Sequence, residues 1–139
     1  MLAAGLVGLA VAGCGGPREP TLGERWYTQS QLDQGRSVFL QNCAVCHGVE
    51  ATGTADWKRR LADGSLPPPP LNGTAHAWHH DLATLDRSIR DGGVPLGGTM
   101  PAFGERLDAE ARQAAIAYFQ SFWSDEIYQR WVGMFGDPR

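Results

Sequence analysis

The chain has 139 residues, of which 12 are Lys or Arg and 15 are Asp or Glu, and its net charge is −3. This weak negative charge gives no reason to expect nucleic acid as a partner, because binding to phosphates requires a basic surface. The 18 glycines and 9 prolines predict long loops, so the helices are expected to be short and to bury little apolar surface by themselves. We therefore expect one small all-α domain, monomeric, with a modest core.

An apolar stretch at residues 2–12 begins the chain and precedes Cys14. It is too short to span a bilayer and predicts a secretory signal over residues 1–13. No Lys or Arg precedes it, which is unusual for such a signal. The glycines and prolines that follow oppose regular structure and predict a flexible tether over residues 14–28. We expect the rest of the chain to be exported.

Val11, Ala12, Gly13 and Cys14 resemble the lipobox of bacterial lipoproteins, in which cleavage precedes the cysteine and its sulfur receives a diacylglyceryl group. Several acyl chains on Cys14 would give a stable anchor. The resemblance implies a lipid-anchored protein on the outer face of the cytoplasmic membrane or in the periplasm. The alternative is an ordinary signal peptide that is cleaved elsewhere.

Apolar residues at helical spacing predict about four short helices in the remaining chain. Three of them cover about residues 30–42, 81–91 and 108–122. Ser30 is the expected cap of the first helix and Asp108 that of the last, since short oxygen-bearing side chains accept hydrogen bonds from the first turn.

Residues 29–123 form the predicted domain. A further helical turn is expected within it at residues 57–61. The tail at residues 124–139 carries Ile127 and Trp131 at helical spacing, and it predicts a short helix packed on the domain surface.

Cys43, Cys46 and His47 belong to the sequence Cys-Ala-Val-Cys-His, which is the attachment motif of a c-type haem. Two thiols three positions apart can each form a thioether with one vinyl group, and the adjacent imidazole can bind the iron. A CxxC redox pair and half of a zinc site are the alternatives, but no second Cys/His pair at ligand spacing and no βαβ pattern accompany the motif. We predict one covalent haem c, with His47 as an axial ligand.

Met100 lies in a Gly-rich loop and is followed directly by Pro101. A thioether is a soft, neutral ligand that suits haem iron, and a His/Met pair fills both axial positions. A methionine that fills a gap in the core is the alternative, although a loop braced by proline is an odd place for it. Met134, in the tail, is the internal rival. We predict Met100 as the second iron ligand.

The chain resembles the class I cytochromes c in these features. The similarity rests on the Cys/His motif, on Met100 before Pro101, and on a final amphipathic helix that ends in Trp123. It covers about residues 30–123 and is closest to bacterial monohaem cytochromes c that occur alone or as modules of respiratory oxidases. The resemblance implies the class I cytochrome c fold, in which short helices wrap around the haem.

Gly35 and Phe39 acquire a role from this resemblance. In cytochromes c, a glycine and an aromatic residue one turn apart on the first helix cross the last helix at close range. The alternative is a glycine without a special role, which would destabilise the helix by about 1 kcal/mol relative to alanine. We expect the first and last helices to cross at Gly35.

Pro69 is the residue that the resemblance assigns to the support of His47. A ligating histidine needs an acceptor for its other ring nitrogen, which fixes the ring and makes the imidazole a better donor to the iron. In cytochromes c, that acceptor is the carbonyl of a proline just ahead of a Leu-x-Gly, which begins here at Leu71. Pro70 is the near alternative, and a polyproline spacer without a special role is another.

His76, His79 and His80 lie within five positions and can suggest copper or zinc, or a replacement for Met100 as the sixth ligand of the iron. They have no acidic or cysteine neighbours, which favours a hydrogen-bonding role instead. Trp78 is predicted to pack on a haem edge or to donate its indole N–H to a propionate. Trp57 is the other candidate for that bond.

A membrane-tethered carrier of single electrons is the expected function. With His47 and Met100 on the iron, no position is open to a substrate. The expected redox partners are a membrane reductase and a terminal oxidase or a dehydrogenase. Two alternatives remain, a haem enzyme or gas sensor with a labile sixth ligand, and a copper carrier that uses His76, His79 and His80.

Overall fold

The computed structural model describes residues 19–139, and in this range the protein is all-helical. No strand occurs among these residues, which form only two isolated β-bridges. The elements are α1 (Gln29–Asn42), α2 (Ala44–His47), the 3-10 helix η1 (His76–His79), α3 (Leu82–Asp91), the 3-10 helix η2 (Val94–Leu96), α4 (Ala109–Gln120) and α5 (Asp125–Phe135). Within this part of the chain, no helix combines the length and apolar character that crossing a bilayer requires.

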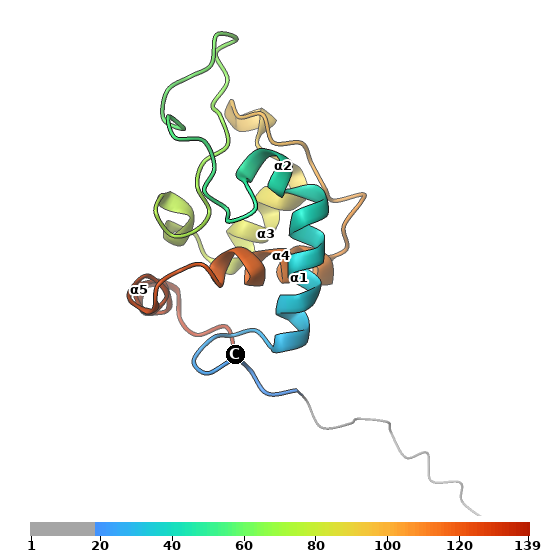
Figure 1. The fold of residues 1–139 in the computed structure, drawn as a ribbon, viewed down its shortest axis with the longest axis vertical. Coiled ribbons are helices and arrows are strands. Elements are labelled where there is room, and N and C mark those ends of the chain that lie inside the picture. Colours follow the sequence, from blue (N-terminus) through green and yellow to red (C-terminus); the bar gives the residue numbers. More distant parts are fainter. Residues whose placement is uncertain (1–18) are drawn as a thin grey trace, which may run out of the picture.

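α1 and α4 cross at Gly35, where the two backbones touch (Figure 1). A Cβ atom added at Gly35 would lie 2.6 Å from the carbonyl carbon of Ala114, and closer still to its oxygen. One turn further on, the ring centroid of the buried Phe39 lies 5.3 Å from that of Tyr118. The expected crossing is confirmed, because only a residue without a side chain permits this approach.

The helix starts follow from side-chain caps, with one correction. Thr28, not Ser30, caps α1: its hydroxyl accepts from the backbone N–H of Gln31, whose side chain in turn accepts from the Thr28 N–H. This reciprocal capping box satisfies two backbone donors that the helix leaves free, which Ser30 cannot do from inside the first turn. Asp108 caps α4 as expected.

Residues 19–28 pack against α4 and α5, so the prediction of a flexible tether is wrong for this part of the chain. Trp26 is 9% exposed and Tyr27 is 2% exposed. The backbone N–H of Trp26 donates to the Tyr128 hydroxyl at 2.8 Å. Burial of two large aromatic side chains outweighs the local preference of glycine and proline for irregular structure. The rest of the predicted tether, with Cys14, and the predicted signal lie outside the described residues.

α5 completes the core, although the sequence predicted a helix on the surface. Tyr128 and Trp131 are each 1% exposed. The Trp131 indole donates to the carbonyl of His80 at 2.7 Å and meets the ring of Trp123 edge to face at 6.1 Å. The helix itself is confirmed, and residues 125–135 belong to the same packed unit as the rest of the domain.

The segment at residues 57–61 is a turn and not the expected helical turn. Its short-range backbone bonds run from Trp57 N–H to the Thr54 carbonyl at 3.2 Å and from Arg59 N–H to the Asp56 carbonyl at 2.8 Å, and they form no helix. It belongs to the long loop before the proline run, drawn in green at the top of Figure 1. The loop returns to the body where Leu66 N–H donates to the Gly97 carbonyl at 2.8 Å.

Candidate haem site

Cys43 and Cys46 lie one helical turn apart, where α1 passes into α2. The carbonyl of Cys43 accepts from the backbone N–H groups of Cys46 at 3.1 Å and of His47 at 2.9 Å. Both thiols are free; Cys43 is half-buried and Cys46 is exposed. Burial, with a smaller contribution from Cys46, raises the pKa of Cys43 to about 11. The backbone thus holds two free thiols one turn apart, and thioether formation requires free thiols.

His47 is 6% exposed, and its ring is oriented by one hydrogen bond. Its Nδ1 lies 3.0 Å from the carbonyl oxygen of Pro69, so Nδ1 carries the proton and Nε2 is left as the electron-pair donor. Burial lowers the pKa of His47, and the bond to Pro69 opposes this effect. The imidazole is therefore neutral, which is the form that binds a metal.

The proline segment approaches His47 closely because Gly53 makes room for it. A Cβ atom at Gly53 would lie 2.6 Å from the Pro69 carbonyl oxygen. Gly53 N–H also donates to the His47 carbonyl at 2.7 Å, and Thr54 N–H donates to the Pro68 carbonyl at 2.9 Å. It is the carbonyl of Pro69 that faces the ring, and not that of Pro70. Sequence reasoning missed Gly53, because a loop glycine gives no local signal of the segment that packs on it.

Met100 is half-buried against the core in the loop that follows η2. Its carbonyl accepts from Gly93 N–H at 2.9 Å. Gly92, at a φ of +77°, permits this approach, because a Cβ there would lie 2.8 Å from the same carbonyl oxygen. Met134 is 49% exposed on α5, so burial favours Met100 as the thioether ligand.

Trp78 and Trp57 take different positions. Trp78 is half-buried and packs against the core, with its ring centroid 3.9 Å from that of His79. Trp57 stacks on the ring of His76 at 5.0 Å. The contact of Trp78 with a haem edge or a propionate stays a prediction.

The three histidines near Trp78 do not converge on a metal. His76 and His80 lie edge to face, with ring centroids 5.6 Å apart. Within residues 19–139, no group of three His, Cys, Asp or Glu side chains is arranged to hold a metal ion. In this arrangement the rings of His76 and His79 lie against Trp57 and Trp78, respectively.

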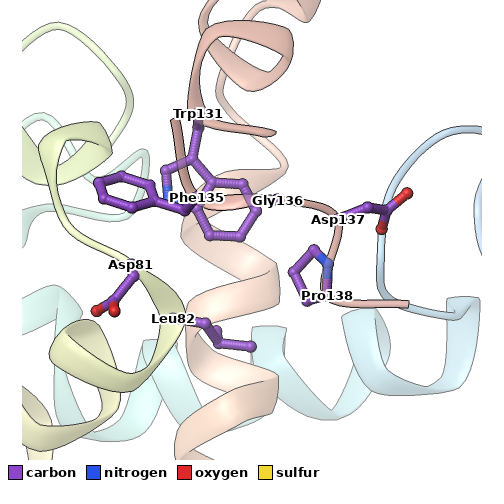
Figure 2. Close-up of a pocket in the computed structure, with 7 residues that line it drawn as sticks. All are labelled: Asp81, Leu82, Trp131, Phe135, Gly136, Asp137 and Pro138. Atoms are coloured by element: carbon purple, nitrogen blue, oxygen red, sulfur yellow. The ribbon is translucent and has the colours of Figure 1, made fainter. Parts of the chain in front are cut away.

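A small cavity of about 150 Å3 lies away from these residues, between the end of α5 and the start of α3. It is lined by Asp81, Leu82, Trp131, Phe135, Gly136, Asp137 and Pro138 (Figure 2). None of the candidate haem residues contributes to it. The candidate haem site is therefore identified from the side chains that could attach and ligate a haem, and not from a cavity.

The donor set fits haem c. Two neighbouring thiols, one neutral imidazole with Nε2 available and one thioether are the groups that attach and ligate such a haem. Two of these residues, Cys43 and Met100, are half-buried against the hydrophobic core, which gives them the apolar surroundings that a macrocycle needs.

Comparison with known proteins agrees with this chemistry. The subunit CcoP of the cbb3-type cytochrome c oxidase from Azospirillum brasilense is 32% identical over 99 residues, which are 70% of this chain and 30% of that protein. The subunit FixP from Azorhizobium caulinodans is 32% identical over 88 residues, 61% of this chain and 25% of that protein. A cytochrome c-553-like protein from Synechocystis is 40% identical over 35 residues, 25% of this chain and 33% of that protein.

The chain thus spans about a third or less of the length of these relatives. No solved structure matches it. Residues 30–119 match the family described as cytochrome c oxidase, cbb3-type, subunit III. This match covers more than half of the chain, which therefore belongs to this family of cytochrome c domains and has covalently bound haem c as its cofactor.

Proposed function

We propose that the protein is a carrier of single electrons with one six-coordinate haem, attached through Cys43 and Cys46 and ligated by His47 and Met100. The observation that carries this proposal is the 3.0 Å contact between His47 Nδ1 and the Pro69 carbonyl, directly after two free thiols. A buried, neutral histidine whose second nitrogen is already bonded is prepared for ligation by Nε2.

The chain's own residues hold the site rigid. When bound, the haem supplies a one-electron couple, and a His/Met pair raises its reduction potential. Pro69 fixes the His47 ring, while the bond from Gly93 fixes the backbone of Met100. With both ligands in place, no coordination position is open to a substrate. Electron transfer then needs little rearrangement of the chain.

We further propose that the protein is exported and anchored through lipid on Cys14, at the outer face of the cytoplasmic membrane or in the periplasm. Its redox partners in this proposal are a membrane reductase and a terminal oxidase or a dehydrogenase. The names of the relatives, which are subunits of a cytochrome c oxidase, support a terminal oxidase and a respiratory role.

Two measurements test the proposed carrier. Acid–acetone extraction followed by mass determination should leave the haem on the chain, whereas bare-chain mass would overturn covalent attachment. Addition of carbon monoxide to the reduced protein should leave its visible spectrum unchanged, because Met100 occupies the sixth position. Rapid, stoichiometric binding of carbon monoxide would instead show that the sixth ligand is labile, and it would favour a gas sensor or an enzyme.

A further inference from the structure

We infer that Trp123 is a positioning residue for His47, acting through the backbone of the proline segment. The inference rests on the proposed role of His47 as an iron ligand. The Trp123 indole N–H donates to the carbonyl oxygen of Leu71 at 2.7 Å. Two residues earlier in the same segment, the Pro69 carbonyl lies 3.0 Å from His47 Nδ1.

The proline segment depends on other parts of the chain for its position. Residues 67–70 are four consecutive prolines, which have no backbone N–H and donate no hydrogen bond. Pro68 accepts from Thr54 N–H, and Leu71 N–H donates to the Ala51 carbonyl at 2.8 Å. Both of these partners lie in the loop at residues 48–54. That loop follows α2 and contains the buried Ala51, so these bonds hold one side of the segment beside His47.

Trp123 supplies a second connection, from the Leu71 carbonyl to the end of α4. It lies three residues after the end of α4, is 2% exposed, and its ring packs near those of Phe119 and Trp131. Its backbone N–H continues the end of α4 by donating to the Gln120 carbonyl at 3.0 Å. The indole therefore holds the Leu71 carbonyl in a fixed position relative to α4.

Gly73 permits this placement of the indole. A Cβ atom at Gly73 would lie 3.2 Å from the Trp123 ring, and the φ of +92° at Gly73 is one that side chains rarely adopt. The chain after Leu71 thus passes closely over the ring whose N–H holds the Leu71 carbonyl.

The expected consequence is electronic as well as geometric. A hydrogen bond from Nδ1–H to a carbonyl makes an imidazole more basic and so stabilises the oxidised iron relative to the reduced iron. Loss of the Trp123 N–H releases Leu71, lets the Pro69 carbonyl move and weakens its bond with His47. The reduction potential should then rise.

The test replaces Trp123 with phenylalanine in the full haem-loaded chain and measures the reduction potential and the exchange rate of the His47 Nδ1 proton. We expect a higher potential and exchange that is about three- to tenfold faster, the factor that corresponds to one neutral hydrogen bond. Trp131→Phe is the matched control, because Trp131 is equally buried and donates its indole N–H to another carbonyl, that of His80, at 2.7 Å.

A second variant removes the N–H without removing the ring. Benzothienylalanine at Trp123 keeps the size of the indole but has sulfur in place of N–H, so it should fold and still raise the potential. Wild-type values in this variant, or an equal rise in Trp131→Phe, would overturn the role of Trp123. Absence of a haem-shifted His47 resonance in the wild-type protein would instead overturn the proposed ligation itself.

Discussion

The indole N–H of Trp26 donates to the side-chain oxygen of Gln120 at 2.6 Å, in a fully buried contact between residues 94 positions apart. Gln120 is 0% exposed at the end of α4, and its Nε2 has no partner among the described residues. The side-chain amide of Gln120 therefore makes one hydrogen bond in this part of the chain, the one that it accepts from Trp26. This contact makes the segment before α1 part of the core.

Trp26→Phe should destabilise the protein by about 1 to 3 kcal/mol, because it leaves the buried oxygen of Gln120 unsatisfied. Chemical denaturation of the haem-loaded chain measures the effect. Glu24→Gln is a suitable control, since Glu24 bonds Gln129 from the same segment but in an exposed position. Equal stability of wild type and Trp26→Phe would show that the segment is not held by this bond.

Gly35→Val should destabilise the protein by about 1 to 3 kcal/mol, the range for overpacking, because its side chain would be forced into the backbone of Ala114. The control is Gly133→Ala in α5, where an added Cβ meets nothing within 4 Å. That variant should raise the free energy of unfolding by about 0.4 to 1 kcal/mol, since alanine lowers the conformational entropy of the unfolded chain. A Gly35→Val protein with the wild-type denaturation midpoint would contradict the tight crossing.

Tyr27 should make the protein sensitive to alkali. Burial raises the pKa of Tyr27 from 10.0 to about 12, although Arg25 acts in the opposite direction. Above pH 10 the unfolded chain loses this proton while the folded chain retains it, so stability falls as the pH rises towards 12. Tyr27→Phe should reduce that loss in denaturation experiments at alkaline pH. An unchanged pH dependence would mean that the Tyr27 hydroxyl is not desolvated.

Met100→Ala should abolish the long-wavelength absorption that an iron–thioether bond gives in the ferric state, and it should lower the reduction potential. Met134→Ala is the internal control and should change neither quantity, because Met134 is 49% exposed on α5. Loss of the band in Met134→Ala alone would transfer the ligand role to the tail.

Cys14→Ser should abolish membrane association without changing the haem spectrum, because Cys14 is not one of the residues proposed to hold the haem. The wild-type protein should partition into membranes and require detergent for release. A wild-type protein that is soluble in the periplasm, with an N-terminus downstream of Cys14, would exclude the lipid anchor.

Local signals in the sequence predicted the parts of the fold that local chemistry determines. Asp108 and the apolar periodicity identify α4, and residues 81–91 contain α3 within one residue of its observed start. Ser30 was wrong as a cap because two hydroxyl residues, two positions apart, compete for this role, and the Gln31 side chain decides in favour of Thr28.

Long-range packing limited the remaining predictions. The glycines and prolines before the first helix suggested a tether. The contact that holds this segment, from Trp26 N–H to the Tyr128 hydroxyl, joins residues 102 positions apart, so local sequence could not reveal it. At the candidate haem site, the resemblance to cytochromes c led to Pro69. The bond from Trp123 to Leu71 joins residues 52 apart, so no spacing rule could reveal it.

The packed segment at residues 19–28 also restricts how far an anchored domain could travel. An extended chain spans at most about 3.5 Å per residue, so ten fewer free residues shorten the reach from Cys14 by roughly 35 Å. In Figure 1 this segment leaves the molecule at the bottom, whereas α2 lies near the top. Under the proposed lipid anchor, the Cys-His end of the domain would therefore stay closer to the bilayer than a free tether up to residue 28 would allow.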